Sequence, residues 1–192
     1  MAICTYEELG MHEANGCVYP KGGISAYAVL KANALTTITD FTDETMWVTA
    51  ILAGDAVVVT DIKAELPAAS PAEGENPVAC GSETILDGLE WTFSVKDFNV
   101  STIDKSLPTP APNNTNDDFY NILNRSQFSA LVLYYCEQDE IRVIIDRVSF
   151  AAFLVSPLSN KEKQYYQVTA KWYQSVNSSM PVLYDTPLGI FS

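Results

Sequence analysis

Residues 113–153 decide the fold, and they read NNTNDDFYNILNRSQFSALVLYYCEQDEIRVIIDRVSFAAF. Polar residues fill the first third, and the remainder holds the most apolar sequence in the chain. Residues 128–136 and 140–155 are rich in aromatic and β-branched side chains, which suit a pleated strand. The polar residues 137–139 between them predict a turn. We therefore expect a short helix that leads directly into a long two-stranded hairpin.

The helix is predicted over residues 116–126. Its first turn holds two aspartates, which are stabilised at the positive end of the helix dipole. Phe119, Ile122 and Leu123 recur at the spacing of one helix face and form an apolar stripe. Because a helix of about three turns is not stable alone in water, we expect it to lie on a sheet.

The second strand of the hairpin contains the sequence RVIIDRV at residues 142–148, which is apolar on both sides of the strand alternation. A strand of this kind is covered on both of its faces. Either the helix and a second sheet supply this cover, or a neighbouring subunit does.

The first half of the chain predicts a strand, a helix and a strand in turn. Residues 24–32 form the first strand. Residues 42–53 are interpreted as a helix that is capped by Thr42 and stopped by Gly54. Residues 56–66 follow as a strand in which apolar and charged residues alternate.

Alternating strands recur in the second half, at residues 89–98 and 166–172. Together these elements predict an α+β fold that is mainly β, an antiparallel sandwich or barrel with one or two short helices at its side. The residues expected in its core are Trp91, Phe93, Val95, Phe119, Leu123, Leu133, Val143, Ile145, Val168 and Trp172.

Composition shifts divide the chain into a single β-rich domain at residues 23–176 and two arms. Residues 1–22 form an irregular N-terminal arm. Within the domain, residues 67–82 and 102–114 are rich in proline and are interpreted as solvated loops. Residues 177–192 form a C-terminal arm.

The C-terminal arm is apolar but has no periodicity. An apolar tail of this kind usually docks onto its own subunit or onto a neighbour, and apolar segments without cover are unfavourable in water. We expect it to be an assembly contact, so that its deletion leaves a folded monomer that no longer assembles. The interface residues expected in it are Val182, Leu183, Tyr184, Ile190 and Phe191.

Residues that carry chemistry are scarce. His12 is the single histidine, and no glycine-rich phosphate loop occurs. Cys4, Cys17, Cys80 and Cys136 form no CxxC pair, so we expect reduced thiols, with a Cys4–Cys17 disulfide as the alternative. We therefore expect no catalytic residues, no cofactor, no bound metal and no enzymatic activity.

The net charge of −13 and the pI of about 4.3 argue against a nucleic-acid-binding face, which would need clustered lysine and arginine. The N-terminal sequence lacks the basic start and apolar core of a secretory signal, so we expect none. No apolar run approaches the roughly 20 residues of a membrane span, so we expect no contact with a membrane.

The order of elements also carries a resemblance. An arm with Cys17 and the residues KGGI at 21–24 leads into a strand, and a helix with Trp47, a proline-rich loop, the strand at 89–98 and the helix with its hairpin follow. This layout resembles small virion proteins of tailed phages that infect gut Bacteroidetes, the crAss-like group. More broadly, it is similar to tail-tube and connector-ring proteins.

The resemblance implies a tail-tube-like β-sandwich with a flanking helix, and a structural role in a virion that is assembled in the host cytoplasm. The expected partners are copies of the chain in a ring and other virion proteins, with DNA passing through the ring without specific binding. An acidic wall fits this passage, because it repels phosphates. The alternative is a bacterial β-sandwich binding module of the adhesin type, against which the lack of a secretory signal counts.

Overall fold

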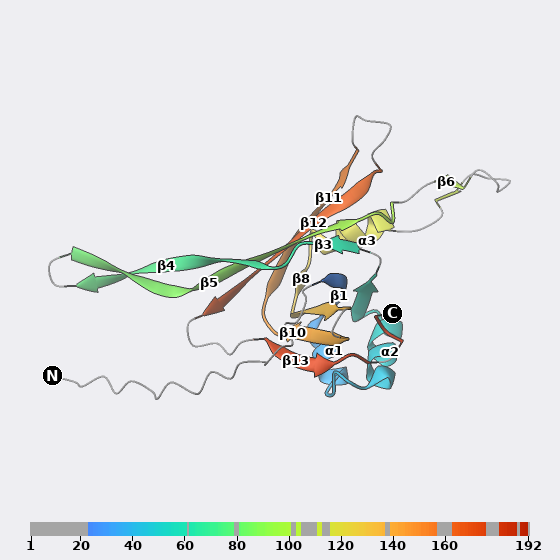
Figure 1. The fold of residues 1–192 in the computed structure, drawn as a ribbon, viewed down its shortest axis with the longest axis horizontal. Helices are drawn as coiled ribbons and strands as arrows, with labels where there is room; N and C mark the ends of the chain where they lie inside the picture. The colour runs from blue at the N-terminus through green and yellow to red at the C-terminus, as the bar shows by residue number, and fades with distance from the viewer. Residues whose placement is uncertain are drawn as a thin grey trace, which may run out of the picture.

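The structure is a computed structural model (Figure 1). It describes residues 23–60, 62–78, 81–100, 103–104, 111–112, 116–136, 139–156, 163–175, 181–187 and 189–191, and for residues 73–78, 81–86, 103–104 and 111–112 it describes the backbone alone. The predicted N-terminal arm at residues 1–22 lies outside the described residues.

Two antiparallel sheets contain most of the described strands, which confirms the predicted α+β fold that is mainly β. The first sheet has the order β13 (Val182–Asp185), β10 (Glu140–Ile144), β9 (Ala130–Tyr135), β1 (Ile24–Leu30) and β2 (Ala56–Val59). The second has the order β3 (Ile62–Ala64), β5 (Gly81–Asp97), β12 (Tyr165–Ser175), β11 (Val148–Val155) and β8 (Gln127–Phe128), with β4 (Ala68–Val78) also paired to β5. A small separate ladder joins β6 (Ile103–Asp104) to β7 (Ala111–Pro112).

Three short helices accompany the sheets: α1 (Ala32–Thr37), α2 (Glu44–Leu52) and α3 (Asn116–Leu123). The first was not predicted. The second is capped by Asp43, whose carboxylate accepts a hydrogen bond from the backbone N–H of Thr45 at 2.8 Å, so the prediction of Thr42 as the cap is wrong. Gly54 ends this helix as predicted, with a positive φ of 72° that suits a residue without a Cβ.

Two apolar cores lie on the two faces of the first sheet. Along β1, Tyr27 and Val29 point into a core shared with the second sheet, whereas Ala28 and Leu30 point into a core closed by α1 and α2. The first core also receives α3 (Figure 1). This arrangement explains why the strands of the first sheet are apolar on both sides of their alternation, since both faces are removed from water.

The predicted hairpin is only half correct. The pairing of β9 with β10 is confirmed, but the expected strand over residues 140–155 breaks after Ile144. Residues 137 and 138 of the predicted turn lie outside the described residues. The chain then crosses to the second sheet, where it continues as β11. The crossing exposes Ile145 (64%), so its predicted place in the core is wrong.

The predicted strand over residues 56–66 divides in the same way. Its first part, β2, belongs to the first sheet, and its second part, β3, belongs to the second sheet. The alternation of apolar and charged residues indicates which face of a strand is buried. It does not indicate which sheet the strand joins through its backbone hydrogen bonds. The two breaks are therefore two of the places where the chain passes from one sheet to the other.

Residues 67–82 are not the solvated loop that their prolines predicted. Residues 68–78 form β4, the first strand of a long hairpin, which pairs with β5 from Ala68 opposite Thr92 to Val78 opposite Gly81. Proline lacks a backbone N–H and is excluded from central strands, but an edge strand tolerates it. Since β5 is the one strand that pairs with β4 among the described residues, the prolines of β4 cost no hydrogen bond on its other side. The proline-rich residues 102–114 likewise include the short ladder of β6 and β7.

The helix at residues 116–123 buries a different stripe from the predicted one. Tyr120 and Leu123 are buried, Phe119 is half-buried, and Ile122 is exposed. Asn124 then ties the end of the helix to β11, since its amide donates to the carbonyl oxygen of Ala152 at 2.7 Å and its carbonyl oxygen accepts from the N–H of the same residue at 2.6 Å. The helix is thus fixed to the second sheet.

Part of the C-terminal tail packs against its own subunit, so the expectation of a loose apolar arm is wrong. Residues 182–185 form β13, which extends the first sheet beside β10. Phe191 is 3% exposed and lies in the core beneath α2. Its ring meets Trp47 edge to face at 5.2 Å between centroids, and Tyr134 lies 5.5 Å away.

Candidate interaction surfaces

The hairpin of β4 and β5 projects far beyond the body of the molecule (Figure 1). Its base is part of the second sheet, because β12 pairs with β5 as far as Gly88. Beyond Gly88, β4 and β5 pair only with each other among the described residues, and a β-bulge between Ala72 and Glu73 marks the change. A Cβ at Gly88 would lie 2.4 Å from the carbonyl oxygen of Gln174, so glycine is required where the ribbon leaves the sheet.

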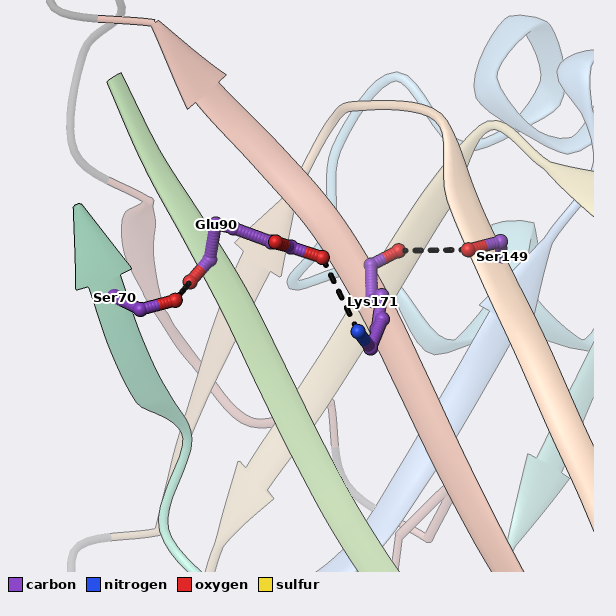
Figure 2. Close-up of polar contacts among 4 residues, drawn as sticks. All are labelled: Ser70, Glu90, Ser149 and Lys171. Atoms are coloured by element: carbon purple, nitrogen blue, oxygen red, sulfur yellow. Dashed lines mark hydrogen bonds and ion pairs between the residues drawn. The ribbon is translucent and has the colours of Figure 1, made fainter. Parts of the chain in front are cut away.

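A line of polar contacts crosses the second sheet near the base of this ribbon (Figure 2). The ammonium group of Lys171 on β12 contacts the carboxylate of Glu90 on β5 at 3.2 Å. Ser70 on β4 donates to the main-chain oxygen of Glu90, and Ser149 on β11 donates to that of Lys171, both at 3.4 Å. Exposed ion pairs of this kind contribute only about 0–1 kcal/mol. These contacts therefore add little to stability, and they place polar and charged groups on this face of the sheet.

The predicted interface residues of the tail divide into two groups. Tyr184, Ile190 and Phe191 pack against the core beneath α2, in the same subunit. Val182 and Leu183 are exposed, at 52% and 49%, on the edge strand β13. Their assignment to an interface between subunits stays a prediction, and the geometry makes β13 available for it through its open edge.

An apolar groove of about 280 Å³ opens between the two sheets, near the edge that carries β13. Trp91 and Trp172 of the second sheet form one wall and lie parallel, with 5.9 Å between ring centroids and 3° between planes. Tyr135 and Arg142 of the first sheet lie on the other side, with the guanidinium carbon 5.5 Å from the ring centroid. Trp91 donates its indole N–H to Gln174 at 2.9 Å, so its ring offers the groove an apolar surface.

A polar cluster lies buried where α3 meets the second sheet. Asp97 is 2% exposed and accepts a hydrogen bond from the hydroxyl of Tyr120 at 2.5 Å. Its other oxygen accepts from the backbone N–H and the side-chain amide of Asn99, at 2.8 and 2.9 Å. The hydroxyl of Tyr27 lies near that of Tyr120, but it forms no well-aligned hydrogen bond with any described residue. Both carboxylate oxygens of Asp97 accept hydrogen bonds, and the bond from Tyr120 joins α3 to β5.

This cluster predicts a loss of stability in alkali. Burial raises the pKa of Tyr120, with the neighbouring Tyr27 and Asp97 adding to the rise, and burial likewise raises the pKa of Tyr27. The unfolded chain ionises its tyrosines near pH 10, whereas the folded chain keeps these two protonated. Their contribution to stability is therefore complete below pH 10 and is lost as the pH rises further.

We expect the free energy of unfolding to fall above pH 10, by up to about 1.4 kcal/mol per pH unit for each of the two tyrosines. Tyr120→Phe removes one titrating group and should make this decline shallower, although it lowers stability at neutral pH. Urea unfolding between pH 8 and pH 11.5 measures both effects. An equally steep decline in Tyr120→Phe would show that Tyr120 does not cause it.

Within the described part of the chain, no three His, Cys, Asp or Glu side chains are grouped so that they could hold a metal ion. Cys136 is exposed and its thiol is free. His12, Cys4, Cys17 and Cys80 lie outside the described residues. A separate finding is that no helix in the described ranges is both long and apolar enough to cross a membrane.

Neither the groove nor the buried cluster was predicted from the sequence. Trp91 and Trp172 were correctly expected to point inward, but the pairing of their strands sets them side by side, and spacing along the chain does not show this. Asp97 is the last residue of β5, at an inward position of the alternating strand, and it offered a faint signal because a buried acid must have its oxygens satisfied.

Comparisons of the chain with protein-family models, with curated proteins and with solved structures find no match. The function has to be argued from the surfaces themselves.

Proposed function

We propose that the protein is a structural subunit of a tailed-phage tail or of its head-to-tail connector, and that it assembles into a ring or tube around the path of the DNA. The observation that carries this proposal is the projecting ribbon of β4 and β5 (Figure 1). A two-stranded hairpin is at best marginally stable in water without further cover. A ribbon that reaches well beyond the body therefore gains most from lying on a neighbouring subunit.

Two further features support assembly. The edge strand β13 carries the exposed Val182 and Leu183, and its open hydrogen-bonding side suits pairing with another subunit. At the opposite edge of the same sheet, β2 carries the half-exposed Val57. Contacts between two different surfaces join subunits head to tail, and such contacts close into a ring when their rotation closes.

The charge of the chain is consistent with a DNA passage. A net charge of −13 gives a wall that repels phosphates, so that DNA slides past without binding. Lys171, the cation in the polar line of the second sheet, is itself paired with Glu90 (Figure 2).

The test is the mass of the purified full-length chain by mass photometry, with negative-stain images of the same sample. We expect closed oligomers or tubes. In a matched variant, residues 74–85 are replaced by an Asn-Gly turn, which shortens the ribbon at the pair Glu73–Leu86 and leaves the body intact. This variant should keep its thermal transition and lose the oligomer, because the part of the ribbon that would lie on the neighbouring subunit is gone.

Lys171→Ala is the control, since it changes the outer face of the body and leaves the ribbon untouched. It should assemble like the unmodified chain. A full-length chain that is monomeric at every concentration, or a shortened ribbon that still gives the same oligomer, would overturn the proposal. A folded monomer that binds a glycan or a host surface would instead favour the adhesin-like alternative.

A further inference from the structure

The groove between the two sheets has the dimensions and chemistry of a site for a peptide segment. Its volume of about 280 Å³ lies below the roughly 300–1,000 Å³ of pockets that enclose a compact ligand. One or two apolar side chains of a chain running along the surface would fill it. The parallel rings of Trp91 and Trp172 provide a flat apolar wall for such side chains.

Among the described residues that line the groove, Arg142 is the one with a charged side chain. Arg142 lies over the ring of Tyr135, and no described carboxylate forms an ion pair with it. An apolar site with one unpaired guanidinium at its rim favours a segment that combines apolar and acidic residues.

The chain contains such a segment at residues 1–22, which joins the described part of the chain at Gly23, near the groove. The described residues start at Gly23, where an added Cβ would lie 4.0 Å from the sulfur of Cys136. Ile24 is paired with Tyr135, which itself lines the groove. The described part of the chain therefore begins near the mouth of the site, and the 22 residues that precede it could reach up to about 70 Å if extended.

The composition of this segment matches the groove. Three glutamates against one lysine make residues 1–22 acidic. Its apolar residues are spread along its length: Ile3, Tyr6, Leu9, Met11, Val18 and Tyr19. Because the segment is tethered next to the site, its effective concentration there is far above that of any free partner.

We propose that the groove is the docking site of residues 1–22 of the same chain, with apolar side chains of the segment against the two tryptophans and a glutamate paired with Arg142. This docking covers the part of the apolar lining that is still exposed, such as Leu66 and the half-buried Trp91. It does not depend on the proposed assembly, since a monomer would show it as well.

The first test maps what lies in the groove. Leu66 lines the rim and is exposed, so the photocrosslinker p-benzoylphenylalanine is introduced there in the full-length chain. After irradiation of a mixture of ¹⁴N- and ¹⁵N-labelled protein, mass spectrometry should find adducts with residues 1–22 in which both peptides carry the same label. Adducts of mixed label would assign the groove to a second copy, and adducts with other segments or none at all would also overturn the proposal.

The second test measures release of the segment. Endoproteinase Glu-C cleaves after glutamate, and the segment holds Glu7, Glu8 and Glu13. Arg142→Glu should speed cleavage at these sites about tenfold over the unmodified chain, because proteolysis follows the population of the open form. The matched control is Arg147→Glu, an exposed arginine outside the groove, which should leave the rate unchanged.

Arg142→Gln provides a milder variant that removes the charge without reversing it, and it should give an intermediate rate. Equal cleavage rates in the Arg142 and Arg147 variants, with both proteins folded by their thermal transitions, would overturn the pairing with Arg142.

Discussion

Phe191→Ala is expected to lower the free energy of unfolding by about 3–5 kcal/mol, the usual cost of removing a buried phenylalanine ring. The ring lies in the core beneath α2, edge to face against Trp47 and close to Tyr134. Its removal leaves a cavity between the helix and the first sheet, although the residue stands next to the last one in the chain. Urea unfolding followed by tryptophan fluorescence measures this effect.

Leu183→Ala is the matched control, because this residue lies in the same tail but is 49% exposed on β13. We expect it to cost less than about 0.5 kcal/mol, as surface substitutions usually do. If both variants are equally stable, the tail does not bury Phe191 in its own subunit, and the original expectation of a free assembly arm would return.

Leu123→Ala is expected to cost about 2–5 kcal/mol of unfolding free energy. The side chain is 0% exposed and belongs to the core that the two sheets share. It is also the apolar anchor of α3, whose end is held to β11 by the two hydrogen bonds of Asn124. The loss therefore weakens the attachment of the helix as well as the packing, and thermal or urea unfolding measures it.

The neighbouring Ile122→Ala is the control for this helix. Ile122 was predicted to share the buried stripe, but it is 58% exposed in the structure. A cost below about 0.5 kcal/mol is expected for it. The reverse order, with Ile122 the more costly, would mean that the helix is rotated about its axis.

The candidate surfaces were predicted less well than the fold. The exposed Val182 and Leu183 could be selected from the sequence as apolar tail residues, but Phe191 has the same apolar character and is buried. Composition does not distinguish the two cases, because burial depends on whether a partner surface lies within reach. For the tail that surface is formed by Trp47 and Tyr134, which are far away along the chain.

The ribbon of β4 and β5 was missed for a different reason. Prolines and glycines at residues 67–82 predict a loop, since these residues interrupt the hydrogen bonds of a central strand. An edge strand needs only one set of backbone bonds, and that set is provided by β5. Whether a strand is central or at an edge is a property of the sheet and not of the segment.

The sequence by itself determined the fold class, the pairing of the strands on either side of residues 137–139, the Gly54 stop and the inward side of the strands at 89–98 and 166–172. These features depend on local periods and local backbone preferences, which a short segment carries within itself. The tertiary structure decided which sheet each strand joins, where residues 56–66 and 140–155 break, and which apolar side chains remain exposed. Those outcomes depend on backbone hydrogen bonds and packing between segments far apart in the chain, and intrinsic β-propensity is easily overridden by such contacts.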